Sequence, residues 1–313
     1  MYLDPRSIIH SWLNNESIES RLSGPHDYLR VAESALSEDI QDLIEYLVPN
    51  LSTAENEILN FRRAQLGNDA EAAQTHLANA LTYSRNSSSR DHILEARIRM
   101  EWGVLRSTLD ENEIAGTDLK WAMERFSALE EGHPWHGIAC LNMAEWHRAR
   151  NEWGMSLAIH SSISRHGPHQ IETIAMSRRM AADIYVEIGQ MMNALRNMWI
   201  SFHGFQHTGL MDLAVESGLQ WLDLGLAFVE SSAPLMDTVV ENSTPRSHQE
   251  KITEPVVNLS DVKSAYNWIC DNLENRSGLN RPDLHVLADT ADMLGVEFNT
   301  DGIQDQELLK RYQ

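Results

Sequence analysis

The chain has 313 residues, of which 42% are apolar, and a formal net charge of −21. Its length allows two domains or one extended repeat array, and its apolar content is enough to fill a hydrophobic core. A negative field of this size repels phosphate backbones and anionic membrane surfaces, and no cluster of Lys and Arg in the sequence offsets it. We therefore expect neither a nucleic-acid partner nor a membrane partner.

The apolar runs are too short for a secretory leader or a membrane span. Near the N-terminus the longest run is Ile8-Ile9, and no stretch approaches the roughly 20 apolar residues that a spanning helix needs. The two cysteines, Cys140 and Cys270, lie far apart in the chain, which argues against a disulfide framework and fits a reducing compartment. These features predict a cytoplasmic protein.

Helical periodicity runs through nearly the whole chain, whereas the alternating pattern of half-buried strands is close to absent. Helix-length runs are separated by short breakers such as LGND, DENE, HGP and HTG. The expected fold class is therefore all-α. Within residues 1–50 we expect three or four short amphipathic helices, one of them with Ser37 as its N-cap, that cap the segment after them.

Residues 51–230 contain a recurring spacing. Its clearest copy is Ala182, Tyr185, Gly189, Ala194 and Met198, which places a small residue, an aromatic residue, a glycine, a second small residue and a large apolar residue in order. Partial copies occur on both sides, and their equivalent first-helix positions are separated by 42, 41, 38 and 36 residues: Phe61, Gly103, Ala144, Ala182 and Gly218.

This spacing resembles the tetratricopeptide repeat, in a variant with a longer period than usual. The resemblance implies an α-solenoid of about five helix pairs, in which the small residues let the two helices of a pair approach closely. In the third pair the same register places inward-facing residues on both helices: Cys140, Met143, Ala144, His147, Ser156, His160 and Ile163.

The window HPWHGIACLNMAEWHRAR, residues 133–150, holds three histidines and Cys140. His136, Cys140 and His147 share one helix face. However, His147 would lie about 10 Å along the helix axis from Cys140, whereas zinc needs all its ligands within about 2.3 Å. We interpret His147 and His160 as packed side chains that replace the aromatic residues of the family. One alternative stays open, in which histidines at neighbouring inter-repeat turns share a metal ion: His133, His136, His166, His169, His203 and His207.

The resemblance also implies where a partner binds, on the concave face formed by the first helices. Mapping that face onto this sequence gives candidate peptide-binding residues that are mostly apolar and include four arginines: Arg62, Arg97, Met100, Val104, Ile138, Leu141, Arg148, Met176, Arg179, Val186 and Leu219. Further lining positions are Ile58, Leu66, Val215 and Leu222. Such a face suits an amphipathic or extended peptide with apolar anchors and some acidic side chains held by guanidinium groups.

The segment after the repeats has a different composition. Residues 231–257 contain Pro234, Pro245 and Pro255 among polar residues, and we predict a flexible linker there. Helical patterning returns in SDVKSAYNWICDNLE, RPDLHVLADTADMLG and DQELLKRY, which predicts a small helical module over residues 258–313. Part of this module resembles helix-extended-helix modules that contact nucleic acid, but it lacks their basic face.

No short motif for catalysis is present: the sequence lacks a Gly-rich phosphate loop, H-E-x-x-H, G-x-S-x-G and C-x-x-C. We therefore expect no catalytic residue, no metal and no cofactor. The leading hypothesis is an adaptor or scaffold that binds a protein or peptide. The alternative is a signal-responsive regulator whose C-terminal module docks on the groove, and an enzyme or metal-binding protein is less favoured. Self-association, or docking of the chain's own ends on the apolar face, is a further expectation.

Overall fold

The computed structural model describes residues 3–86, 90–109, 111–230, 240–242, 252–254, 259–275 and 280–298. The fold is all-α, an α-solenoid of helix pairs, with a single short hairpin among the described residues. The chain divides into two compact units, Met1–Trp146 and His147–Gln313, and the boundary falls within helix α8. No helix in the described part of the chain is long and apolar enough to cross a bilayer.

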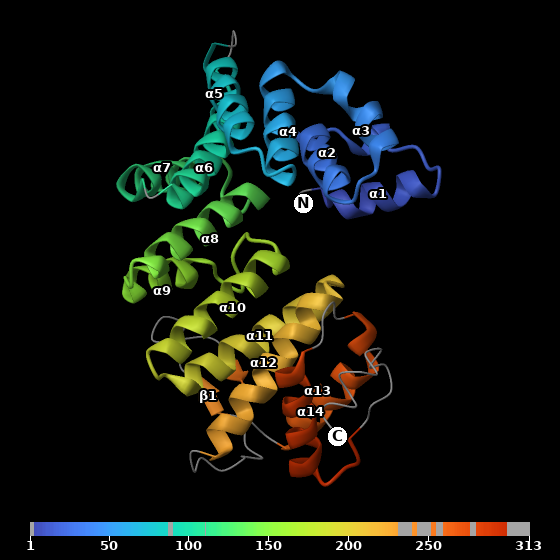
Figure 1. Ribbon diagram of the computed structural model, residues 1–313, viewed down its shortest axis with the longest axis vertical. Helices are drawn as coiled ribbons and strands as arrows, with labels where there is room; N and C mark the ends of the chain where they lie inside the picture. The colour runs from blue at the N-terminus through green and yellow to red at the C-terminus, as the bar shows by residue number, and fades with distance from the viewer. Residues whose placement is uncertain are drawn as a thin grey trace. The chain divides into compact units, whose positions relative to one another are not determined.

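The first unit begins with short helices and continues with long antiparallel pairs (Figure 1). Its elements are α1 (Pro5–Leu13), η1 (Glu19–Arg21), α2 (Asp27–Ser37), α3 (Gln41–Leu47), η2 (Val48–Asn50), α4 (Thr53–Leu66), α5 (Ala70–Asn86), α6 (His92–Thr108), α7 (Asn112–Glu130) and α8 (Pro134–Ala149). Helix α4 pairs with α5 and α6 pairs with α7, while α2 packs on α4.

The second unit continues the pairing. Its elements are α9 (Trp153–Ser162), α10 (Ile171–Glu187), α11 (Met191–Thr208), α12 (Met211–Glu230), β1 (Val240–Asn242), β2 (Ile252–Glu254), α13 (Leu259–Asp271), η3 (Leu273–Asn275) and α14 (Arg281–Leu294). Helix α10 packs along α11, and α11 packs along α12. Strands β1 and β2 are antiparallel, with Val240 opposite Glu254 and Asn242 opposite Ile252.

Helix ends follow local sequence. A capping box begins α4, in which Ser52 accepts from the Glu55 amide while the Glu55 side chain accepts from the Ser52 amide. Asn280 and Asp283 form the same arrangement at the start of α14. Gly189, with φ of +74°, makes the left-handed turn between α10 and α11, as its place in the repeat predicts. Ser37 was expected to be an N-cap, but that prediction is wrong.

Ser37 is instead the last residue of α2, and its hydroxyl donates to the Glu33 carbonyl inside that helix. The chain turns two residues later, where Asp39 has a φ of +56°. A serine hydroxyl can bond backward to a helix carbonyl as well as cap the next helix. The acidic residues after Ser37 therefore belong to the turn that follows α2.

The packing positions of the repeat are confirmed by burial. The five equivalent first-helix positions, Phe61, Gly103, Ala144, Ala182 and Gly218, are buried, while Tyr185 is half-buried. The predicted second-helix positions are also buried, with no more than 2% of each exposed: Ala73, Leu77, Ala80, Ala115, Leu119, Ala122, Ser156, His160, Ile163, Ala194 and Met198. In α6 a Cβ on Gly103 would lie 2.5 Å from Leu119 Cγ in α7. Glycine is therefore required there for the two helices to approach so closely.

The C-terminal helices pack directly on the last repeat helix. Helices α13 and α14 both contact α12, and a Cβ on Gly218 of α12 would lie 2.9 Å from Ile269 Cδ1 of α13. Gly218 thus allows α12 to approach α13 closely, as Gly103 allows α6 to approach α7. We interpret α13 as the partner that completes the fifth helix pair.

The predicted linker, residues 231–257, lies outside the described residues except for the two strands, and so does the predicted helix DQELLKRY.

Candidate functional site

The eleven candidate residues divide by their exposure. Ile138 and Val186 are exposed, at 43% and 39% of their surface. Arg97, Met100 and Leu219 are buried, with 5%, 1% and 3% exposed. The remaining candidates are half-buried: Arg62, Val104, Leu141, Arg148, Met176 and Arg179. The candidate side chains therefore do not form one continuous apolar strip.

Arg97 of α6 is held by two carboxylates inside the first unit. Its Nη2 donates to Glu33 Oε1 of α2 at 2.9 Å, and its Nη1 is paired with Glu101 one helical turn away. Its guanidinium carbon also lies 5.6 Å from the centre of the Trp135 ring. Burial raises the pKa of Glu33, and the neighbouring Arg97 offsets only part of that effect. Arg97 therefore fastens the N-terminal helices to the repeats.

The other three arginines also have partners in the chain. Arg62 Nη1 donates to Gln65 Oε1 at 2.7 Å. Arg179 of α10 makes a forked pair with Glu216 of α12, at 3.1 and 2.6 Å. Arg148 Nη1 lies 3.4 Å from Glu187 Oε1. Guanidinium groups already bound to other side chains of the chain are poor anchors for an acidic partner, because a new contact would have to replace an existing one.

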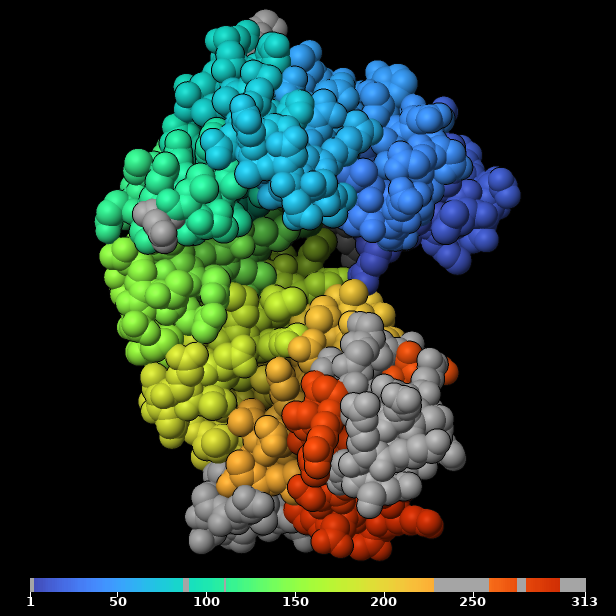
Figure 2. Space-filling model, in the orientation of Figure 1, coloured from blue at the N-terminus to red at the C-terminus, as the bar shows by residue number. Residues whose placement is uncertain are grey.

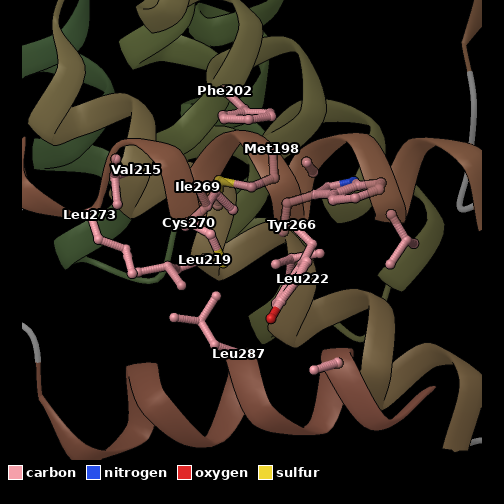
Figure 3. Packing of buried hydrophobic residues seen from close by; sticks show 14 of the residues in the cluster. Met198, Phe202, Val215, Leu219, Leu222, Tyr266, Ile269, Cys270, Leu273 and Leu287 are labelled. Atoms are coloured by element: carbon pink, nitrogen blue, oxygen red, sulfur yellow. The ribbon is translucent and has the colours of Figure 1, made fainter. Parts of the chain in front are cut away.

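Leu219 lies under the C-terminal helices. Figure 3 shows Leu219, Leu222 and Val215 of α12 close to Ile269 and Leu273, with Leu287 of α14 beside them. Met198 and Phe202 of α11 complete this apolar cluster. These three lining positions of α12 are therefore part of a core, and they are covered by the chain itself.

Val186 stands at the rim of a pocket of about 310 Å³ in the second unit. Asp183 and Glu187 of α10 lie beside it in the sequence and line the same pocket. From α11 and α12 come Met198, Gln220, Asp223 and Leu224. Burial raises the pKa of the Asp223 carboxyl. The open part of the candidate face in this unit thus joins apolar side chains to several carboxylates.

The histidines of the HPWH window are buried side chains that bind backbone groups. His133 Nδ1 accepts from the Trp135 amide, and His136 Nδ1 accepts from the Gly132 amide, both at 3.1 Å. Burial, with Arg30 and neighbouring histidines, lowers the pKa of His133 to about 3, so its ring is neutral. Among the described residues, no three His, Cys, Asp or Glu side chains gather as metal ligands would.

His147 and His160 are packed as the repeat register predicts. His147 Nδ1 lies 2.6 Å from Glu152 Oε2, and His160 Nδ1 lies 3.1 Å from Ser177 Oγ inside the core. Cys140, at another inward position of the register, is also buried, and burial raises its thiol pKa to about 12. A thiol with so high a pKa is a packing group and a poor nucleophile.

One pocket of the first unit gathers several titratable groups. Its volume is about 300 Å³, and Asp27, Arg30 and His133 are among its lining residues. Asp27 accepts from the Gly24 amide at 2.7 Å, and Arg30 donates to the Leu3 carbonyl and pairs with Asp27. These groups hold the N-terminal loop in place, which gives them a structural role.

Sequence reasoning missed three residues of α12 at the candidate face: Glu216, which binds Arg179, and Gln220 and Asp223, which line the pocket. Their spacing of four and then three residues places them on one helix face, which was a usable signal. The carboxylates Asp183 and Glu187 show the same spacing on α10. Pattern alone could not tell this acidic face from an ordinary solvated one.

No family model matches the sequence, and no curated protein matches it. Among solved structures, the apo form of RapI is similar with a TM-score of 0.47 and 13% identity, over 98% of this chain and 78% of that chain. BtubC (BKLC) from P. vanneervenii has a TM-score of 0.41 and 12% identity, over 79% of this chain and 100% of that chain. TM-scores below 0.5 identify no family, so the architecture rests on the helix packing described above.

Proposed function

We propose that the chain is a non-catalytic scaffold that binds a protein or peptide through the exposed face of its first helices. The observation that carries the proposal is Val186, an apolar side chain left exposed at the rim of the 310 Å³ pocket between α10 and α12. The packing residues Ala182, Ala194 and Met198 of the same repeat are buried, whereas Val186 is not. Helix-repeat proteins commonly bind partners on such surfaces.

The chemistry of the pocket supports binding over catalysis. Its residues are carboxylates, an amide and apolar side chains, and none of them forms a nucleophile and base pair. The Ser177 and His160 pair is closer to that chemistry, but both side chains are almost completely buried. A substrate could reach neither of them without opening the core.

The alternative function, a regulator whose C-terminal helices leave the groove on a signal, is disfavoured by the size of their apolar contact. The cluster buries five large side chains from these helices and the turn between them: Tyr266, Ile269, Leu273, Leu284 and Leu287. Burying each contributes about 1.5–3 kcal/mol, or roughly 8–15 kcal/mol together. A ligand with a micromolar Kd supplies about 8 kcal/mol. These figures favour a permanent cap.

The test is selection of binders by the purified full chain from a displayed library of random 12-residue peptides. We expect enriched peptides whose affinity, measured by fluorescence anisotropy, falls at least tenfold in the Val186→Glu variant. Met155→Glu is the matched control, because Met155 is an exposed apolar residue of α9 in the same unit, away from the pocket. Absence of enriched peptides, or an equal loss in both variants, would contradict the proposal.

A further inference from the structure

The first unit carries arginine and tryptophan side chains along one face of the α6 and α7 pair. These two helices pack along each other, and Figure 2 shows part of the pair at the surface of the first unit, in teal and green. Positions four, seven and eleven residues after Glu95 in α6, and after Ile114 in α7, share one face of their helix. We call the six residues at these positions the arginine–tryptophan strip: Arg99, Trp102, Arg106, Asp118, Trp121 and Arg125.

At the start of the strip, three arginines surround Glu95, whose side chain is completely buried. Arg85 donates to Glu95 Oε1 through Nε at 3.0 Å and through Nη2 at 2.8 Å, and Arg90 Nε donates to Oε2 at 2.8 Å. Arg99 Nε lies 3.5 Å from Oε1. Burial raises the pKa of Glu95, but the hydrogen bonds from Arg85 and Arg90 outweigh it and hold the pKa below its usual value. One ionised carboxylate balances one guanidinium, so positive charge is left over here.

The excess of positive charge continues along the strip. Asp118 is shared by two arginines, since Arg99 Nη1 lies 3.3 Å from Oδ1 and Arg106 is paired with Oδ2. Arg125 has no carboxylate partner among the described residues. The described side chains of this face thus hold five arginines against three carboxylates: Arg85, Arg90, Arg99, Arg106 and Arg125 against Glu95, Glu111 and Asp118. In a chain with a net charge of −21, this local excess complements an acidic ligand.

Two half-buried tryptophans hold the guanidinium groups in place. The guanidinium carbons of Arg99 and Arg125 lie 4.3 and 5.2 Å from the centre of the Trp121 ring, and that of Arg106 lies 4.8 Å from the centre of the Trp102 ring. A stacked guanidinium loses less freedom when it binds a carboxylate, and Trp and Arg are the residues that protein interfaces favour.

This arrangement differs from the one at Arg97. There, two carboxylates share one arginine, so an acidic partner would have to displace one of them. Along the strip the carboxylates are outnumbered, and each guanidinium has five N–H donors, of which the existing contacts use only some. A carboxylate from a partner would therefore add contacts without displacing any.

The far end of the strip offers apolar contacts. Leu109 and Ile114 lie on either side of the turn between α6 and α7, and they are 45% and 52% exposed. A protein segment can place an apolar residue here and its acidic residues at the arginines. Nucleic acid fits less well, because the stacked guanidiniums occupy the tryptophan faces that bases would need, and the acidic chain repels phosphate.

We propose that the arginine–tryptophan strip binds an acidic segment of a protein partner, whose carboxylates contact Arg125 and the arginines beside it while an apolar residue of the segment contacts Ile114. This surface belongs to the first unit, whereas the Val186 pocket belongs to the second, so the inference goes beyond the proposed scaffold site and does not depend on it. The acidic ligand that the sequence predicted for the groove is thus assigned to a different face of α6.

The experiment repeats the peptide selection with the full chain carrying Val186→Glu, so that the first proposed site is blocked. Peptides with Asp or Glu near Leu, Ile, Val or Met should be enriched. Adding Arg125→Gln should weaken the best peptide at least tenfold in fluorescence anisotropy, with little change in the melting temperature, because Arg125 has no ion pair to lose. Lys120→Gln is the matched control: it removes the same charge from an exposed position of α7 outside the strip, and should change the Kd less than twofold.

A second pair of variants tests the apolar end of the strip. Ile114→Glu should also weaken the best peptide at least tenfold, because it replaces the apolar contact with a charge that repels the acidic ligand. Leu13→Glu, at an exposed apolar position of α1 in the same unit, should change the Kd less than twofold. Equal losses in these two variants would overturn the inference.

The remaining outcomes separate this inference from the scaffold site. Absence of enriched peptides, enriched peptides without acidic residues, or equal losses in Arg125→Gln and Lys120→Gln would overturn the inference and leave the Val186 site to its own selection. An oligodeoxythymidine of the same length that binds as tightly as the best peptide would overturn it in favour of nucleic acid. Self-association in sedimentation velocity that Arg125→Gln abolishes would overturn it in favour of a second copy of the chain. Acidic peptides that bind the strip, with none that depend on Val186, would support the inference and contradict the scaffold site.

Discussion

The two ends of the repeat array are covered by opposite kinds of contact. At the N-terminal end, α2 is fastened to the repeats through a buried arginine that two carboxylates share, Arg97 with Glu33 and Glu101. At the C-terminal end, α13 and α14 are fastened through an apolar cluster around Ile269 and Leu287. Ionic contacts require matched partners and respond to pH, whereas apolar contacts depend on area and shape. The N-terminal cap therefore has an ionic contact that responds to pH in addition to buried apolar residues such as Leu29 and Leu47.

The largest effect is expected from Arg97→Ala in the first unit. It leaves the Glu33 and Glu101 charges buried without their shared cation, and breaking a buried pair in this way costs about 3–5 kcal/mol. Urea unfolding at pH 7 measures the loss. Because the pKa of Glu33 is raised, lowering the pH toward 5 should protonate it in the folded variant and recover part of that loss. A variant equally unstable at both pH values would contradict this account of the network.

The apolar cap is broken most directly by Leu287→Ala. Leu287 is fully buried, and truncating such a residue costs about 2–5 kcal/mol because its contacts are lost and a cavity remains. Leu259→Ala is the control, since Leu259 is 46% exposed at the start of α13. The loss in Leu287→Ala should be independent of pH between 5 and 7. A pH-dependent loss would erase the distinction between the caps.

His26 joins α2 to two later helices and adds to the pH dependence of the first unit's stability. It contacts Glu55 at 2.9 Å and Asp91 at 3.4 Å. Burial alone would lower its pKa, but hydrogen bonds to Asp91 and Glu55 and their negative charge raise it to about 9. The imidazolium therefore stabilises the fold fully below pH 6.5, and this contribution, on the order of 3 kcal/mol, is lost as the pH rises through 9.

His26→Gln should flatten the decline in stability between pH 6.5 and 9 that urea unfolding of the parent shows. His203 is the control: its ring packs against Trp199 and Phe202, and this partial burial lowers its pKa, so the ring is already neutral in this range and His203→Gln leaves that decline in place. Parallel curves for the parent and His26→Gln would show that another group titrates in this range.

The smallest effect is expected for the Arg179 and Glu216 pair. Arg179→Gln removes a half-buried ion pair on the pocket face, and pairs of this kind contribute about 0–1 kcal/mol to stability. Neither Arg179 nor Glu216 lines the pocket at Val186. The affinity for the selected peptides and the unfolding free energy should therefore both hardly change, and a fall in affinity would indicate that Arg179 itself contacts the partner.

The repeat packing could be predicted from sequence because the required residues are local. Gly103, Ala115 and Leu119 lie within one helix pair, so spacing alone reveals the close approach of the two helices. Whether an arginine of the groove is already bound within the chain depends on residues that lie far from it in the sequence. Glu33 and Arg97 are 64 residues apart, and nothing in the sequence near Arg97 indicates that it is already bound.

For His147 and His160, burial could be predicted from the sequence but the hydrogen-bond partners could not. The repeat register correctly places His147 and His160 inside the packing, since the residue at each position is set by the neighbouring helices. Their hydrogen-bond partners, Glu152 and Ser177, could not be assigned from spacing, because they come from a turn and from another helix. The side chains that line the pocket at Val186 were likewise hidden, since α10 and α12 meet only in three dimensions.

The contact between Gly218 and Ile269 has a consequence for how the molecule folds. Gly103 and its partner Leu119 are 16 residues apart in the chain, whereas Gly218 and Ile269 are 51 apart. In the unfolded chain, closing the longer loop costs about 1 kcal/mol more entropy, which slows the encounter by roughly fivefold. During synthesis, moreover, α12 is made well before the helices that cover it. The last helix pair should therefore be the last to close, and its uncovered apolar face the place where a nascent chain is most prone to aggregate.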